Sequence, residues 1–181
     1  VRIVFIPETI GSIYYLSRNY KKMKKNIDFA FNITCVGDSR NYSFIPSRKN
    51  NTNTDSLTRH VYKFFAKNFK EYSWNDRGSD ERNYCSPGID LPMCTIMRSK
   101  FGDYKEYHTS LDNLKFISKK GLNGSLKVLK NTIKYIESKR GNIYTTYNLF
   151  TRTRARNPSN VMASIFRFVG IPVVFNSSGF M

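Results

Sequence analysis

The sequence predicts an α/β fold whose sheet is doubly wound and mostly parallel. Apolar runs of strand length alternate with segments whose apolar residues recur at helical spacing, and this alternation is typical of such folds. The chain has 181 residues, of which 40% are hydrophobic, and this is enough for one domain with a substantial core. Since it contains no run of about 18 or more apolar residues, we expect no transmembrane helix.

The N-terminal part of the chain is predicted to form two strands with a helix between them. Residues 1–6 are a continuous apolar run that Pro7 ends, as expected for a buried strand of the parallel type. Residues 11–25 form a helix, because apolar residues recur at helical spacing from Ile13 onward. The lysines at its end suit the negative pole of a helix dipole. Residues 29–36 are the next apolar run and the second strand.

Further elements follow a polar, asparagine-rich loop. Residues 55–68 have an apolar face of helical period, and residues 72–74 are predicted as a short strand. Residues 91–97 form the third apolar strand. Residues 122–138 are the clearest helix, because apolar side chains recur along one face. The apolar segment at 161–174 is interpreted as a helix followed by a strand.

Four polar residues that could carry chemistry fall where predicted strands end or in loops between elements: Glu8, Asp38, Asp80 and His108. In doubly wound sheets, binding sites gather in the loops at the carboxyl ends of the strands. A strand-end glutamate, a mid-chain aspartate and a late histidine are ingredients of a zinc-hydrolase site. Each has a structural alternative, as a helix N-terminal acid, a turn-capping aspartate and a loop histidine bonded to backbone.

Three segments carry a family resemblance. They are FIPETIGS at residues 5–12, GSDERNYCSPGIDLP at residues 78–92 and EYHTSLD at residues 106–112. In this order they resemble a bacterial aminopeptidase-like family whose members often occur among polysaccharide-biosynthesis functions. They are more distantly similar to zinc aminopeptidases of the aminopeptidase Y type and to glutaminyl cyclases. The resemblance predicts an aminopeptidase-like catalytic domain over residues 1–140, with residues 141–181 as a C-terminal extension without an assigned role.

The resemblance implies a role for each matched residue. Glu8 matches the glutamate that serves as general base, and His108 matches the late histidine that binds zinc. Thr9 stands where the resembled group has a second, metal-binding glutamate, and Thr34 stands where an aspartate ligand is expected. Asp38, a few residues further on, is therefore a candidate metal ligand in place of that aspartate.

Other residues near these motifs are expected to orient the ligands or to bind substrate. They are Asp80, Arg77, Arg82, Tyr107 and Asp112. An arginine suits a substrate carboxylate, and an aspartate can orient the second ring nitrogen of a zinc-binding histidine. Glu81 replaces the histidine that follows the matched aspartate in the resembled group.

The chain begins inside a predicted strand and without an initiator methionine, so we expect it to be a fragment. Two further ligands of the resembled group, an early histidine and a bridging aspartate, would then precede Val1. The complete protein is expected to bind one or two Zn²⁺ ions. As a metallo-aminopeptidase it would hydrolyse an amide or peptide bond at an N-terminal residue, whereas the fragment alone is expected to be inactive and to bind no metal.

Charge and cysteine content restrict the partners and the location. A net charge of +17 permits a basic nucleic-acid-binding module. The basic residues are scattered, however, which favours a solvated surface with only non-specific attraction to nucleic acid. Three cysteines without a CxxC pair indicate reduced thiols in a cytoplasmic protein. The lack of a long apolar run leads us to expect no membrane partner. The expected partner is a peptide or amide substrate, and a homo-oligomer is allowed. A non-catalytic, ligand-binding protein of the same fold is the main alternative, favoured by Thr9 and Thr34.

Overall fold

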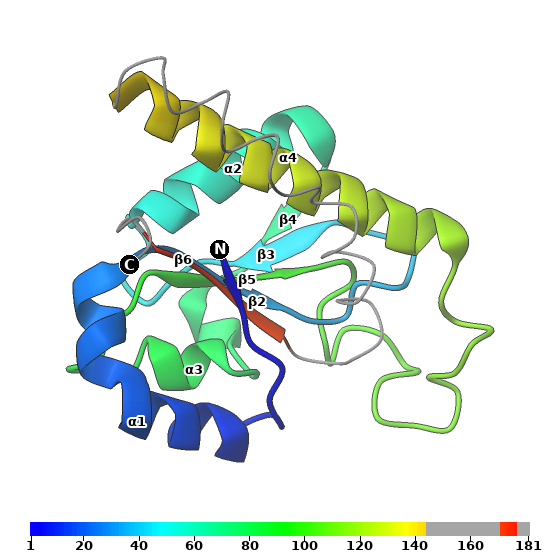
Figure 1. Cartoon of the computed structure of the whole chain (residues 1–181). Helices are drawn as coiled ribbons and strands as arrows, with labels where there is room; N and C mark the ends of the chain where they lie inside the picture. The colour runs from blue at the N-terminus through cyan, green and yellow to red at the C-terminus, as the bar shows by residue number, and fades with distance from the viewer. Residues whose placement is uncertain (144–170, 177–181) are drawn as a thin grey trace.

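The computed structural model describes residues 1–143 and 171–176, which form one sheet with helices on both faces (Figure 1). The strands are β1 (Arg2–Ile3), β2 (Ile27–Ile33), β3 (Ser43–Ile45), β4 (Lys70–Glu71), β5 (Met93–Met97) and β6 (Ile171–Asn176). The helices are α1 (Ile10–Asn26), α2 (Asn53–Phe65), α3 (Glu81–Tyr84) and α4 (Lys119–Ile143), with a 3₁₀ turn η1 (Trp74–Asp76).

The strand order is β1-β6-β2-β5-β3-β4. The central pair β2–β5 is parallel, as is β3–β4, whereas β1–β6, β6–β2 and β5–β3 are antiparallel. The sheet in the described residues is therefore mixed, and the expectation of a mostly parallel sheet is corrected. Parallel pairing is kept between the two central strands, where helices cover both faces, and antiparallel strands flank that pair.

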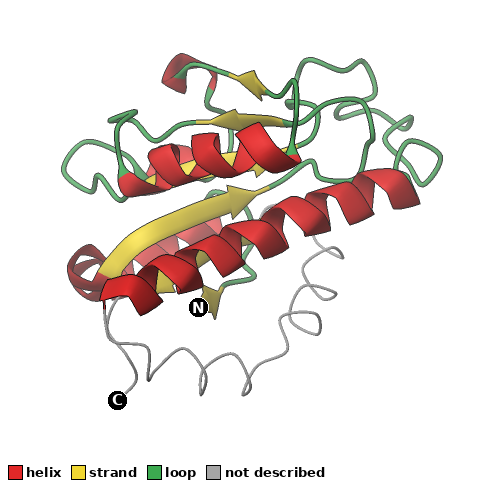
Figure 2. Ribbon diagram, turned by 90° about the horizontal axis from the view of Figure 1, so that it is seen from above, coloured by secondary structure: helices red, strands yellow, loops and turns green. Residues whose placement is uncertain are grey.

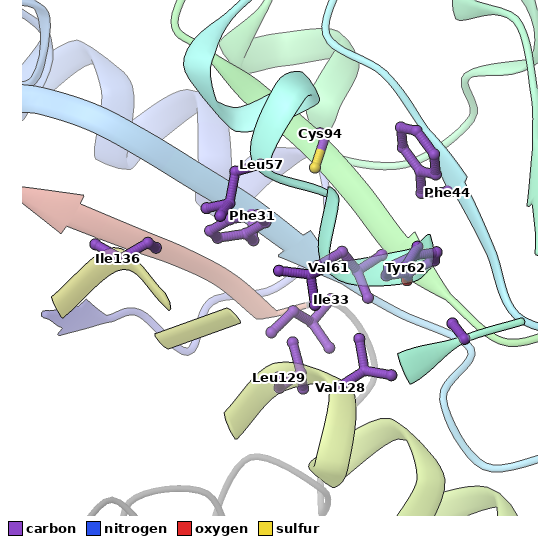
Figure 3. Close-up of a cluster of buried hydrophobic side chains, with 12 residues drawn as sticks. Phe31, Ile33, Phe44, Leu57, Val61, Tyr62, Cys94, Val128, Leu129 and Ile136 are labelled. Atoms are coloured by element: carbon purple, nitrogen blue, oxygen red, sulfur yellow. The ribbon is translucent and has the colours of Figure 1, made fainter. Parts of the chain in front are cut away.

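Helices α2 and α4 lie over one face of the sheet, and α1 and α3 lie over the other (Figures 1 and 2). The core on the α2/α4 side joins side chains from β2, β5 and both helices. Its labelled members are Phe31, Ile33, Phe44, Leu57, Val61, Tyr62, Cys94, Val128, Leu129 and Ile136 (Figure 3). A second core on the α1/α3 side contains Leu16, Met23, Ala30, Tyr84, Cys85, Leu91 and Met93. The domain is thus a three-layer α/β structure.

Successive side chains of the central strands point alternately to the two faces of the sheet, so each belongs to one of these two cores. In β2, Phe31 belongs to the α2/α4 core and Ala30 to the α1/α3 core. In β5, Cys94 belongs to the α2/α4 core and Met93 to the α1/α3 core. Because side chains of a strand point alternately to the two faces, the next residue on the α1/α3 side of β2 is polar Asn32.

Helix α2 has a strong N-terminal signal. Thr52 and Asp55 form a capping box, in which the Asp55 carboxylate accepts the Thr52 N–H at 2.9 Å. The same buried carboxylate accepts the N–H and the hydroxyl of Ser47 at 2.7 and 2.6 Å. The capping box explains why the helix starts at Asn53, slightly before the predicted start at residue 55.

The sequence-based boundaries differ from the structure in short elements. The predicted strand over residues 1–6 is reduced to β1, which pairs with β6 at the edge of the described sheet. The predicted strand over residues 72–74 is instead the approach to η1, because the Ser73 hydroxyl accepts the Asn75 N–H and caps that turn. Residues 171–174 of the predicted C-terminal strand lie within β6, whereas 161–170 lie outside the described residues. None of the helices described here has the length and apolar character needed to cross a bilayer.

Candidate active site

The first and third sequence motifs follow strands β1 and β5, which run in the same direction as β2. The motif at residues 78–92 precedes β5 and is joined to Glu8 by a hydrogen bond. β6 is antiparallel to both β1 and β2, and β2 is parallel to β5, so the carboxyl ends of all three strands face one edge. Glu8 follows β1 at this edge, Asp38 follows β2, and the segment that carries His108 follows β5. Glu8, Asp38 and His108 thus each lie beyond the carboxyl end of a strand, whereas Asp80 lies before β5.

Glu8 is joined to the motif at residues 78–92 by side-chain hydrogen bonds. The Ser79 hydroxyl donates to Glu8 Oε1 at 2.7 Å, and the Thr9 N–H donates to Asp80 Oδ1 at 2.8 Å. Arg82 Nη2 also donates to Thr9 Oγ1 at 2.7 Å. Glu8 itself is solvent-exposed, so its carboxylate is held from one side and remains accessible from the other.

Thr9 adopts a conformation that is unfavourable for a β-branched residue. Its φ is 63°, in the left-handed region, and it immediately precedes α1. Strain of this kind costs roughly 1–3 kcal/mol and persists only when neighbouring contacts fix the backbone. The bonds to Asp80 and Arg82 supply such contacts, and they explain how the chain turns sharply between Glu8 and the helix.

Asp80 is fully buried beside the N-terminus of α1. Burial raises the pKa of its carboxyl above the ordinary value, and the charges of Glu8 and Glu81 add to the rise. The Thr9 N–H and the Ser12 hydroxyl act in the opposite direction by favouring the charged form. Asp80 therefore ties down the N-terminus of α1 directly after Glu8.

Glu81 is a fully buried carboxylate that accepts four hydrogen bonds. Its Oε1 accepts the backbone N–H groups of Gly78 and Ser79 at 2.8 and 3.0 Å. Its Oε2 accepts Asn32 Nδ2 at 3.0 Å and the Thr95 hydroxyl at 2.6 Å. The carboxylate thus joins the central strands to the loop that carries Ser79.

Asp38 is buried in a different set of contacts. Its carboxylate accepts the N–H and the hydroxyl of Ser99, both at 2.9 Å, and the N–H of Arg40 at 2.8 Å. Arg40 Nε also lies 3.6 Å from Asp38 Oδ1. These bonds tie the segment after β2 to the segment after β5, so Asp38 has a structural role there whether or not it can turn toward a metal.

The loop that contains His108 is held by an arginine. The Arg40 guanidinium lies 4.5 Å from the Phe116 ring centroid and 5.3 Å from that of Tyr104, and its Nη1 is 3.4 Å from Glu106 Oε2. The Tyr104 and Phe116 rings stack on each other at 5.0 Å. This cluster fixes both sides of the loop around His108.

His108 itself is exposed, with φ at 57°, and its ring stacks on Tyr107 at 4.0 Å between centroids. Among the described residues, no hydrogen bond reaches either ring nitrogen, so the structure does not place Asp80 or Asp112 against them. Desolvation raises the pKa of Tyr107, and the charges of Cys35, Glu8 and Asp112 add to the rise.

A close contact brings the loops on either side of the site together. A Cβ atom at Gly78 would lie only 2.5 Å from a ring carbon of Phe101, so the glycine lets the 78–81 loop lie against that ring. Phe101 in turn lies 6.3 Å from Tyr107, centroid to centroid. Arg77 is turned to Trp74, with its guanidinium 5.0 Å from the indole ring.

The described residues do not contain a complete metal centre, since no three His, Cys, Asp or Glu side chains gather there to hold an ion. Glu8, Asp80 and Arg82 are brought together through hydrogen bonds of Thr9 and Ser79, and Tyr107 and His108 form a second group by ring stacking. Asp38 belongs to a separate cluster with Ser99.

Sequence reasoning missed Ser79 and the buried network of Glu81. The available signal was polar residues, Asn32 and Thr95, within otherwise apolar strands. Their significance depends on register, because Asn32 and Thr95 are directly paired between β2 and β5. That pairing cannot be read from either strand alone.

Comparison with known proteins gives a family match and two related proteins. Residues 1–139 match the family described as "Domain of unknown function (DUF4910)". A protein of Clostridium acetobutylicum named "Putative polysaccharide biosynthesis protein with aminopeptidase-like domain" is 40% identical over 139 residues, which are 77% of this chain and 32% of that protein.

A solved structure from the same organism, described as a "putative peptidase", is 38% identical with a TM-score of 0.68, over 72% of this chain and 30% of that chain. The chain thus spans about a third of the length of the relatives it matches. The expected resemblance to a bacterial aminopeptidase-like family is confirmed.

Proposed function

Because this chain belongs to the DUF4910 family, we propose that it forms part of a zinc-dependent, aminopeptidase-like hydrolase. The observation that carries the proposal is the meeting of the three motifs at one edge of the sheet. There, Glu8 is held by Ser79, and Phe101 lies against Gly78 on one side and 6.3 Å from the Tyr107 ring, centroid to centroid, on the other. The substrate would be a peptide or amide with a free N-terminal residue, and the reaction a hydrolysis.

Glu8 is suited to the role of general base. One carboxylate oxygen accepts the Ser79 hydroxyl, and the exposed group can take a proton from the attacking water and return it to the leaving amine. Such a base must be oriented but remain accessible, and the Ser79 bond supplies orientation on one side only. The Thr9–Asp80 bond fixes the backbone directly after it.

His108 is the candidate zinc ligand. Imidazole nitrogen and carboxylate oxygen are donors that zinc prefers, and His108 is exposed with no described hydrogen bond on its ring. Bound zinc would supply a Lewis acid that lowers the pKa of a water from ~15.7 toward ~7. The remaining ligands would come from the part of the longer relatives that this chain does not cover.

Arg82 and Arg77 are the candidates for holding a substrate carboxylate. Both are exposed, and Arg82 reaches the edge through its bond to Thr9. Since only one Arg82 nitrogen is used in that bond, the guanidinium retains donors for a second partner. A cytoplasmic location is part of the same proposal, supported by the free thiols of the three cysteines.

The test uses a protein of the relatives' full length that contains this domain. Glu8→Gln is expected to lower peptidase turnover by about 100-fold or more while zinc content stays unchanged, because the base is lost and a metal ligand is not. His108→Ala is expected to lower zinc content, measured by elemental analysis. Asn123→Ala, on the exposed surface of α4, serves as the control for both.

Either of two results would contradict this proposal. Full turnover in the Glu8→Gln variant would show that Glu8 is not the general base. Unchanged zinc stoichiometry in the His108→Ala variant would show that His108 is not a zinc ligand. Absence of zinc from the unaltered long protein would favour the non-catalytic alternative. That alternative is supported by Thr9, whose hydroxyl is occupied by Arg82, and by Thr34, which is buried and donates to Cys35 Sγ at 3.7 Å.

A further inference from the structure

We propose that Glu81 and Ser79 are positioning residues for Glu8, and that they connect the paired strands β2 and β5 to the base through one chain of hydrogen bonds. The inference rests on the proposed function for the role of Glu8 alone. The connection itself is a property of the fold and can be tested without substrate or metal.

The chain of bonds starts in the sheet. Asn32 and Thr95 are register partners in β2 and β5, and both donate to Oε2 of Glu81. Asn32 Nδ2 also lies 3.3 Å from the Thr95 hydroxyl, which ties the two donors to each other. All three side chains are fully buried, so the position of the Glu81 carboxylate is set by the strands and not by solvent.

The second step runs from Glu81 into the loop that precedes α3. Its Oε1 accepts the backbone N–H groups of Gly78 and Ser79, two consecutive residues. An ionised carboxylate offers only acceptors, so it can receive all four donors at once. The backbone at Ser79 is thereby fixed relative to β2 and β5.

The third step reaches the candidate base. Ser79 Oγ donates to Glu8 Oε1 at 2.7 Å. Ser79 is buried, whereas Glu8 is exposed, so the bond holds a mobile carboxylate by a side chain that is itself anchored. Without the Glu81 anchor, the Ser79 hydroxyl would lose its fixed place, and Glu8 would lose the side-chain hydrogen bond that holds it.

The test measures the carboxyl ¹³C resonance of Glu8 in the chain from Val1 to Met181 at neutral pH, assigned by its disappearance in Glu8→Gln. Ser79→Ala is expected to shift this resonance, because the carboxylate loses a hydrogen bond. Glu81→Met, which keeps the volume but removes the acceptors, is expected to shift it in the same direction by a comparable amount. Ser79→Thr, which keeps the hydroxyl, should restore most of the original position.

Ser86→Ala is the matched control, because the Ser86 hydroxyl bonds to Asn83 at the other end of α3 and does not touch Glu8. An unchanged resonance in Glu81→Met beside a shifted one in Ser79→Ala would remove Glu81 from the chain of bonds. An equal shift in Ser86→Ala would show general loosening and would overturn the proposal. If Glu81→Met does not fold, amide exchange in the unaltered chain decides, since Gly78 and Ser79 must then exchange about 100-fold or more slowly than an open loop.

The complete protein supplies a second readout. Ser79→Ala and Glu81→Met are expected to lower kcat by about 10- to 100-fold with little change in KM, as for other residues that act through a neighbour. If Glu8→Gln left turnover intact, the proposed function would fail while the resonance test still stood. A shifted resonance with unchanged kcat in both variants would show that the connection has no part in the reaction.

Discussion

The Asp80 carboxyl group is buried, which disfavours its charged form, and it also accepts a hydrogen bond from the backbone at the start of α1. Burial raises its pKa, while the Thr9 N–H holds one of its oxygens at 2.8 Å. In the unfolded chain the same group titrates near its ordinary value of 3.8. The folded state therefore keeps the proton to a higher pH than the unfolded state does, and folding stability is linked to this difference.

The sign of the pH dependence follows from that direction. As pH rises from about 3.8 through the raised folded pKa of Asp80, the folded state binds more protons than the unfolded state, so this group lowers stability progressively. The Asp80→Asn variant has no carboxyl group at this position, so it does not lose this stability as pH rises. The difference in unfolding free energy between Asp80→Asn and the unaltered chain should therefore move in favour of the variant as pH rises. Urea unfolding between about pH 3.5 and 7 measures it, with Ser86→Ala as a control whose difference stays flat.

Helix α4 shows how close packing at one turn decides the position of a whole element. Gly121 lies against the turn after β2, where an added Cβ would be 2.1 Å from the Gly37 carbonyl oxygen and 2.3 Å from that of Asp38. The N–H of Ser118 also donates to the Gly37 oxygen at 2.9 Å. The helix thus begins in direct contact with the segment after β2 that contains Asp38.

Gly121→Ala is expected to destabilise the domain by about 1–3 kcal/mol, because backbone atoms would have to move apart. The higher helix propensity of alanine, worth about 1 kcal/mol, acts in the opposite direction and is outweighed by a clash with backbone. Chemical denaturation checks this, and Asn123→Ala, exposed in the same turn, should change stability by less than about 0.5 kcal/mol. Equal effects of the two substitutions would show that the close approach has no energetic cost.

The long helices and the central strands could be predicted from sequence, whereas the short elements could not. The predicted helices at 11–25 and 122–138 correspond to α1 and α4, because periodicity extends over several turns. β3 is three buried residues within a polar run, and α3 is a single turn, so neither offers a period to detect. Glu8 and His108 are predicted as site residues from their motifs, and this stays a prediction, whereas the network of Glu81 depends on the register of two distant strands.

The basic residues of the described part of the chain are distributed over both faces of the sheet. Exposed lysines at the end of α1, such as Lys21 and Lys25, lie on one side, and Lys127 and Lys134 of α4 lie on the other (Figure 1). A nucleic-acid interface usually concentrates positive charge on one face. This arrangement favours a solvated, generally basic surface, despite the net charge of +17.

Binding to duplex DNA is therefore expected to be weak and non-specific. The affinity should fall steeply with salt and be lost near about 0.2 M, since it arises from counterion release alone. Fluorescence anisotropy with two unrelated duplexes of equal length measures it between about 0.05 and 0.2 M salt. Tight binding at the upper concentration, with preference for one duplex, would support the nucleic-acid-binding alternative instead.

The position of β6 in the sheet determines when, during synthesis of the chain, β1 can pair with its neighbour. β6 lies between β1 and β2, so the described partner of the first strand is the last strand. At typical rates of translation, Ile171–Asn176 leaves the ribosome on the order of ten seconds after Arg2–Ile3. During that interval the strand that leads into Glu8 lacks β6 as its neighbour, and this part of the sheet forms only after residues 171–176 have been made.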